Sequence, residues 1–140
     1  MRHRLLASFA GAALVLAGVA AAREPSPAGA EVYIVSPRDG ATVKGPVTVV
    51  FGLKGMGVAP AGIKFDGTGH HHLLVDSDPP ADLSQPLPAN EKTIHFGKGQ
   101  TETTLTLPPG KHTLQLVLGD LLHIPHDPAV ISKKITIIVQ

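Results

Sequence analysis

The chain of 140 residues contains no cysteine and no tryptophan, and it has only one tyrosine and four phenylalanines. The absence of cysteine excludes disulfide bonds, thiolate catalysis and cysteine-based zinc sites. It equally excludes a lipid anchor attached to a cysteine. Stability must therefore come from packing alone, and with aromatic residues few, histidines take the place of the usual aromatics.

The first 22 residues have the composition of a secretory signal peptide. Met1–Arg4 is basic, Leu5–Val19 carries no charge, and Ala20–Ala22 offers small residues for cleavage. The apolar stretch is shorter than the roughly 20 residues of a membrane-spanning helix. The sequence therefore predicts a periplasmic or secreted protein, with no membrane insertion after cleavage. A retained signal anchor is the alternative.

The charge balance argues against several classes of partner. Without residues 1–22 the chain would have 118 residues, with ten Lys and Arg against eleven Asp and Glu. Nucleic-acid binding requires a basic face, and docking on an anionic membrane requires clustered positive charge. We therefore expect neither partner. Nothing in the sequence sets the oligomeric state.

The rest of the chain has the pattern of an all-β domain. Residues 23–30 are small and proline-rich, which predicts a flexible linker. Over 31–140, short β-branched runs alternate with Gly and Pro about every ten residues, which predicts an immunoglobulin-like Greek-key β-sandwich of about seven strands. A β-barrel is the alternative. The expected strands are 32–35, 47–53, 70–76, 93–96, 101–107, 111–118 and 131–139, with 93–96 and 101–107 joined as a hairpin and a short strand at 63–65 as an option.

Histidine is the chemically distinctive residue of this sequence. Imidazole is the commonest metal ligand in proteins, and in an exported, cysteine-free chain a group of them favours copper(II), zinc or nickel. Seven histidines follow the signal peptide: His70, His71, His72, His95, His112, His123 and His126.

The expected topology brings two histidine segments together. If strand 70–76 pairs antiparallel with strand 111–118, the start of the first lies beside the end of the second. The histidine triplet then shares one pole of the sandwich with the loop 119–128, and strand 93–96 runs toward the same pole. The preferred metal ligands are His70, His72, His123 and His126, with His95 or His71 as further candidates and Asp120 in support.

Other interpretations of these histidines remain open. Side chains alternate along a strand, but the alternation does not say which face of 70–76 is the core. His112 begins its strand at the opposite pole, where sandwich domains often place a corner tyrosine. The histidines as a group are alternatively structural, hydrogen-bonded core residues.

The sequence offers no catalytic residues. It contains neither the G-x-S-x-G elbow of serine hydrolases nor the H-E-x-x-H motif of zinc proteases. We therefore predict a protein that is not an enzyme. A metal-dependent hydrolase with an open coordination position is the remaining enzymatic alternative.

Several motifs in order resemble one family. They are Gly69–Asp76 (GHHHLLVD), Ile94–Glu102 (IHFGKGQTE), Leu107–Leu116 (LPPGKHTLQL) and Gly119–His126 (GDLLHIPH). Together they are similar to the exported bacterial domain-of-unknown-function family 4399, over roughly Val32 to Val139. The resemblance implies an exported single domain and carries no activity.

The sequence as a whole favours one function and leaves one rival. The favoured prediction is a soluble periplasmic, histidine-rich module that binds copper or zinc for buffering, delivery or sensing. The rival is a non-catalytic interaction domain of the cell envelope, in which the histidines are structural and the partner is an envelope protein.

Overall fold

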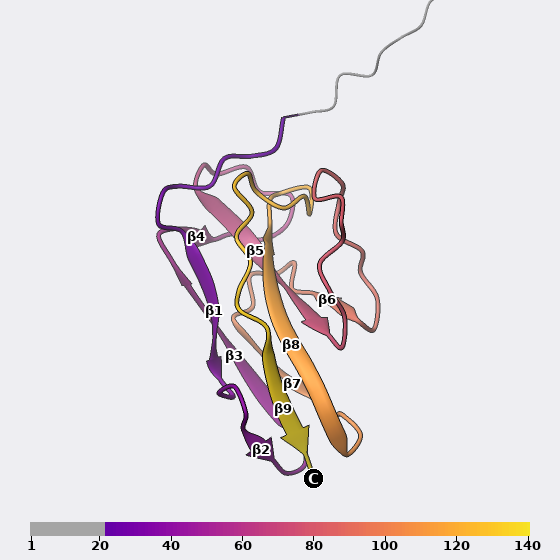
Figure 1. Ribbon diagram of the computed structural model, residues 1–140. Helices are drawn as coiled ribbons and strands as arrows, with labels where there is room; N and C mark the ends of the chain where they lie inside the picture. Colours follow the sequence, from indigo (N-terminus) through magenta and orange to yellow (C-terminus); the bar gives the residue numbers. More distant parts are fainter. Residues whose placement is uncertain (1–21) are drawn as a thin grey trace, which may run out of the picture.

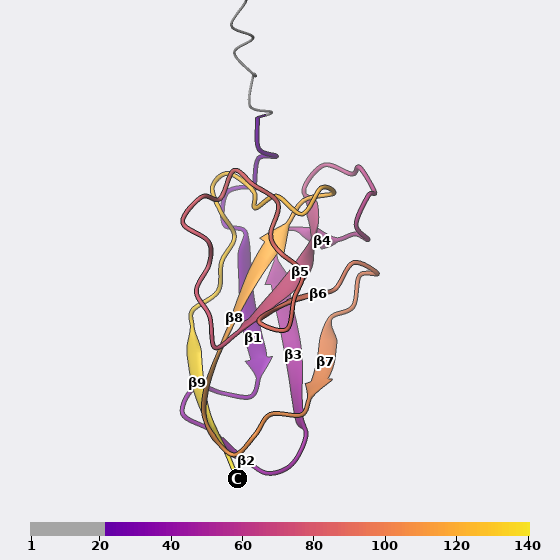
Figure 2. The same ribbon diagram turned by 90° about the vertical axis from the view of Figure 1, so that its right-hand side faces the viewer.

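The computed structural model describes residues 22–140, which form a sandwich of two β-sheets (Figures 1 and 2). Within this range no helix is long and apolar enough to cross a membrane. The smaller sheet has the order β1-β3-β7, formed by β1 (Glu31–Ser36), β3 (Val47–Lys54) and β7 (Glu102–Leu105). The larger has the order β2-β9-β8-β5-β4, formed by β2 (Thr42–Val43), β9 (Ile135–Val139), β8 (Gly110–Gly119), β5 (Thr68–Val75) and β4 (Gly57–Val58); β6 (Thr93–His95) also pairs with β5.

The pairing of β5 with β8 is antiparallel, as the sequence predicts. His70 lies opposite Gly119 and Val75 lies opposite Leu114, so β5 begins where β8 ends. Strand β6 pairs antiparallel with the other side of β5 and places His95 opposite His72. We call the end of the sandwich where β5 begins and β8 ends the loop pole; the chain enters there, and its C-terminus lies at the opposite end (Figure 1).

The main core fills the space between the two sheets. Every second side chain of a strand points into it, because successive side chains of a strand point to opposite faces. In β8 the alternating leucines all face this core and are fully buried. Its central members are Val49 and Phe51 from the smaller sheet and Leu73, Leu114, Leu116, Leu118 and Ile137 from the larger.

A second, smaller core lies on the outer face of the larger sheet. Leu74 and Val117 pack there against Leu87, with Ile131 beside them. Leu87 belongs to the proline-rich connection 77–90, which therefore covers part of this face. As a result β5 is buried on both faces, and its run of histidines and leucines shows no alternation between buried and exposed residues.

Several local predictions were wrong. Segments 93–96 and 101–107 do not form a hairpin, because β6 pairs with β5 whereas β7 pairs with β3 in the other sheet. Segment 63–65 is a loop between two turns, and the last strand begins at Ile135, with Ile131 making only an isolated bridge to Val117. Residues 22–30 form no named strand, but they lie along residues 125–128: Asp127 N donates to Glu24 O at 2.9 Å and Ser26 Oγ donates to Pro128 O at 2.7 Å.

His112 secures the opposite end of β8. Its Nδ1 lies 2.7 Å from Asp76 Oδ2 and its Nε2 lies 2.8 Å from Pro108 O. Both partners are acceptors, so both ring nitrogens donate only in the imidazolium form. The Asp76 carboxylate, followed by the Pro108 carbonyl, accordingly raises the pKa of His112 above its usual value.

This contact predicts a specific pH dependence of stability. The raised folded pKa of His112 adds stability that is fully present below pH 6.5 and is lost as the pH rises through that folded pKa. The variant His112→Phe should lower the free energy of unfolding by about 2 kcal/mol near pH 6, and by less at pH 9. Urea unfolding at the two pH values measures both differences.

The matched control is Asp76→Asn. Asp76 has a φ of 50°, a conformation that asparagine also tolerates. This variant therefore removes the carboxylate charge without straining the backbone. Equal losses at pH 6 and pH 9 in His112→Phe would show that His112 contributes packing and not an ion pair.

Candidate metal centre

The triplet in β5 divides its histidines between the two faces of the larger sheet. His71 points inward with Leu73, and its ring lies 5.1 Å from that of Phe51. His70 and His72 point outward with Leu74, on the side covered by loops. All three imidazoles are buried, at 0–1% exposure.

Four imidazoles gather on the outer face near the loop pole. The ring centroids of His70 and His72 are 4.8 Å apart, and His95 lies 5.0 and 5.2 Å from them. His123 lies 5.0 Å from His70, 6.0 Å from His72 and 4.7 Å from His95. We call these residues the four-histidine cluster. Three of them, His70, His72 and His95, hold ligand nitrogens within 4.8 Å of one another.

The cluster contains buried polar atoms without hydrogen-bond partners. Both nitrogens of His70, both of His72 and the Nε2 of His95 are buried and have no hydrogen-bond partner among residues 22–140. A neutral imidazole has one donor and one acceptor nitrogen, and a buried polar group left unpaired costs roughly 1–3 kcal/mol. These five nitrogens therefore mark a place where the protein alone does not satisfy its polar groups.

The loop after β8 positions the fourth ring. Asp120 is buried, and its Oδ1 accepts hydrogen bonds from the N–H groups of Leu122 and Ile124 at 2.8 and 2.9 Å. His123 then adopts φ of 70°, the left-handed region, and its N–H donates to Asp120 O at 2.9 Å. Leu87 N donates to His123 O at 2.9 Å, so the proline-rich connection supports the same residue.

Two glycines give the rings room. A Cβ on Gly119 would lie 2.8 Å from His72 Cε1, and a Cβ on Gly97 would lie 2.3 Å from His95 Cε1. Neither glycine has the positive φ that would itself require glycine. The absent side chains are therefore explained by the close approach of the imidazoles to the backbone.

The electrostatic environment favours neutral imidazoles. Burial, followed by repulsion from His123 and His95, lowers the pKa of His70 to about 4. Burial, followed by repulsion from His70 and His95, lowers the pKa of His72 to about 3. Burial also lowers the pKa of His95, and that of His71 to about 4. Neutral imidazole is the form that binds a metal ion.

The structure leaves three of the predicted residues outside the cluster. His71 lies on the inner face against Phe51. His126 is buried near Gly69, where its Nε2 lies 3.0 Å from the carbonyl oxygen of Thr68. The carboxylate of Asp120 accepts backbone hydrogen bonds within its own loop. His95, a secondary candidate in the sequence, is instead central.

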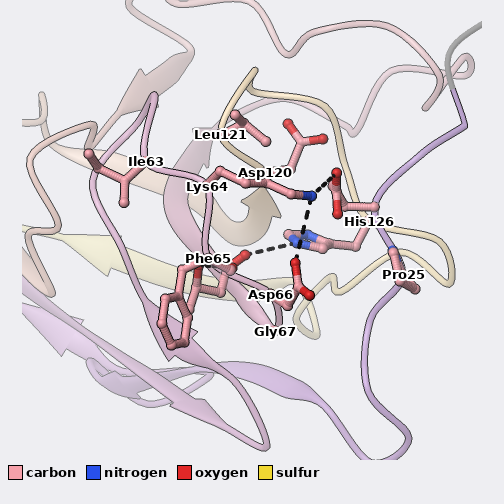
Figure 3. A pocket seen from close by; sticks show the side chains of 11 residues that line it. Pro25, Ile63, Lys64, Phe65, Asp66, Gly67, Asp120, Leu121 and His126 are labelled. Atoms are coloured by element: carbon pink, nitrogen blue, oxygen red, sulfur yellow. Dashed lines mark hydrogen bonds and ion pairs between the residues drawn. The ribbon is translucent and has the colours of Figure 1, made fainter.

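His126 lines a separate pocket at the loop pole. Figure 3 shows this pocket, which has a volume of about 360 Å³ and is also lined by Lys64, Phe65 and Asp120. Lys64 forms an ion pair with Glu24 at 2.5 Å, and its Nζ lies 3.7 Å from Asp66 Oδ1. No sequence pattern predicted this pocket, because its walls come from four separate segments and depend on the loop conformations. These segments are 24–25, 63–68, 120–121 and 126.

Comparison with known proteins places this architecture in a family. The model of the domain of unknown function DUF4399 matches residues 49–140. The chain belongs to the DUF4399 family. The matched region of this DUF4399 protein includes the whole four-histidine cluster. No curated protein matches the chain significantly.

One solved structure similar to the DUF4399 protein contains the fibronectin(III)-like modules of Clostridium thermocellum CbhA. The sequence identity is 13%, the TM-score is 0.39, and the match covers 77% of this chain and 92% of that one. The description of the sandwich above therefore rests on the strand pairing of the DUF4399 protein itself.

The close contact at Gly119 predicts a loss of stability on substitution. In Gly119→Ala the added methyl group would meet the buried ring of His72, and overpacking of this kind costs about 1–3 kcal/mol. The control is Gly57→Ala in β4, whose methyl group would meet only the Thr68 side chain at 3.3 Å and should cost about 0.5 kcal/mol or less. Urea denaturation compares the two; equal losses would contradict the close packing of His72.

The lowered pKa values predict acid destabilisation of the metal-free protein. The unfolded chain binds protons near pH 6.5, whereas folded His70, His71 and His72 bind them only near pH 3–4. The free energy of unfolding should therefore fall as the pH drops from 6.5 toward 4, by up to about 1.4 kcal/mol per pH unit for each histidine. His112 contributes little to this slope, because the stability that comes from its raised pKa is already fully present below pH 6.5.

The measurement is chemical denaturation in the presence of a chelator at several pH values. The variant His71→Leu removes one of the titrating groups from the inner core. Its free energy of unfolding should therefore fall less steeply with decreasing pH, by the contribution of one histidine. An unchanged free energy of unfolding between pH 6.5 and 4 would show that these imidazoles do not stay neutral in the folded protein.

Proposed function

We propose that this DUF4399 protein is a periplasmic or secreted metal-binding module, and that the four-histidine cluster is its metal site. The observation that carries the proposal is that three adjacent rings, with five buried nitrogens unpaired among the described residues, hold ligand nitrogens within 4.8 Å of one another. The nitrogens of His71 are also unpaired, but they lie on the inner face, away from this group. A metal ion would accept one nitrogen lone pair from each ring. It would thereby supply a partner for one of the buried nitrogens of each ring. Imidazole suits zinc and copper, the two metals that we propose.

The role that fits these residues is binding for buffering, delivery or sensing rather than catalysis. The ligands come from two adjacent strands and one supported loop, which would hold an ion in a fixed place. The pocket of Figure 3 is lined by His126 and not by members of the cluster. A substrate in that pocket would therefore not lie next to the ligand nitrogens. The composition of residues 1–22, of which 1–21 lie outside the described part, supports export.

Metal titration of the metal-free protein, without an affinity tag, tests this function. Calorimetry at pH 7.5 should give one zinc or copper(II) ion per chain with a Kd below about 1 µM. The ion should also stabilise the fold by about 2.7 kcal/mol at a free concentration of 100 times Kd. Heat-induced unfolding with and without the metal measures this second effect.

Two adjacent substitutions separate the cluster from the inner face. His72→Leu removes a ligand from the outer face and should weaken metal binding by about 100-fold or more. Substitution of a residue that only supports the ligands typically weakens binding by about 10–100-fold. His71→Leu places the same side chain one residue away, on the inner face, and should leave the affinity unchanged. Equal affinities for the two variants would contradict the proposed site.

A second candidate function is a protein-interaction domain of the cell envelope. Ile63, Phe65 and Leu122 are exposed by 54%, 70% and 57%, and their loops are joined by the hydrogen bond from Gly62 N to Leu121 O. Exposed apolar groups of this kind are typical of contact surfaces. Under this alternative the wild-type protein binds no metal above the background of surface histidines, and His72→Leu changes only stability.

A further inference from the structure

We infer that the four-histidine cluster is a tetrahedral site and is therefore suited to zinc rather than to copper(II). This inference deepens the proposed function and depends on it. It rests on the positions of the four imidazole rings relative to one another.

The ring centroids show how the four rings are arranged, and this arrangement hardly depends on ring rotation. The Cβ–Cγ bond of histidine points through the centre of its ring, so a rotation about this bond changes which nitrogen faces the ion but hardly moves the centroid. The six centroid distances within the cluster are 4.8, 5.0, 5.0, 5.2, 6.0 and 4.7 Å. Five of the six therefore lie between 4.7 and 5.2 Å.

These distances fit four rings around one tetrahedral ion. With a metal–nitrogen distance of about 2.0–2.1 Å, each centroid lies about 3.2 Å from the ion, and tetrahedral rings have centroids about 5.2 Å apart. A tetrahedron with edges like those observed has its centre about 3.1 Å from each corner, which is close to that requirement. His70, His72 and His95 already hold ligand nitrogens within 4.8 Å of one another, and His123 would join them at a common ion after ring rotation and a small shift.

A square-planar arrangement does not fit. It requires four centroid distances of about 4.5 Å and two of about 6.4 Å, and the two long distances must join four different rings. The longest observed distance joins His72 and His123 at 6.0 Å, but the other two rings, His70 and His95, are only 5.0 Å apart. A copper(II) or nickel(II) ion with its preferred planar ligands would have to separate His70 from His95.

The elements that hold these rings oppose such a separation. His72 and His95 lie on hydrogen-bonded neighbouring strands in direct register, and His70 is two residues from His72 on the same face. Gly97 and Gly119 let the backbone come close to His95 and His72. His95 and His123 are the half-buried members, and His123 is the one of the four that lies on a loop rather than on a strand.

Cobalt(II) is the probe for this geometry, because tetrahedral cobalt(II) absorbs visible light far more strongly than octahedral cobalt(II). We expect the wild-type protein with one equivalent of Co²⁺ to be intensely coloured, and one equivalent of Zn²⁺ to abolish the colour by displacement. The control is His123→Asn, since asparagine tolerates the positive φ at this position. This variant should still bind Co²⁺ through His70, His72 and His95, with a changed spectrum and at least about 10-fold weaker affinity.

The outcomes separate the geometry from the proposed function. Stoichiometric binding of Co²⁺ with the weak spectrum of octahedral cobalt would overturn the tetrahedral site while leaving metal binding intact. An ordinary tetragonal copper(II) signal in the electron paramagnetic resonance spectrum of the Cu²⁺-loaded protein would do the same. No binding of Zn²⁺, Co²⁺ or Cu²⁺ would overturn both the geometry and the proposed function.

Discussion

The antiparallel pairing of β5 with β8 determines where the histidines of this protein lie. Because His70 is opposite Gly119, the histidine triplet is placed beside the loop that carries His123 and His126. The other side of β5 pairs with β6 and brings His95 opposite His72. The same pairing fixes the face of every residue in β5, so His71 enters the main core and His70 and His72 face the covering loops. A shift of one residue would exchange these faces and dissolve the cluster.

Burial on both faces of β5 gives the cluster its chemical character. On an exposed face, four imidazoles would be hydrated and would titrate near neutral pH. Under the connection 77–90 and the loop 119–126 they lose water and repel one another when protonated, which lowers the pKa of His70 and His72. The domain thereby gives up stability at acid pH and keeps several neutral nitrogens together. This is a property expected of a preorganised metal site and a costly one for a purely structural core.

The sequence predicted the sandwich and the convergence at the loop pole, because both depend on strand order and direction. It could not assign the face of each histidine: with both faces of β5 buried, the usual alternation of apolar and polar residues is missing. The hairpin across Gly97–Gly99 was wrong for a related reason, since a short glycine-rich connection fits a change of sheet as well as a tight turn. Loop residues were the hardest to place. His123 and His126 are three residues apart, yet a left-handed conformation at His123 sends only one of them into the cluster.

His123 shows how backbone strain and function are connected in this loop. A non-glycine residue with φ of 70° is held at a cost of roughly 1–3 kcal/mol, which the surrounding contacts must offset. Those contacts are the hydrogen bond from Leu87 N to the His123 carbonyl and the backbone bonds to Asp120. Asp120 therefore shapes the loop that carries His123, because its Oδ1 accepts hydrogen bonds from the residues on either side of that histidine. The strain lies at one of the two half-buried rings of the cluster, where a metal ion bound by His123 would offset part of its cost.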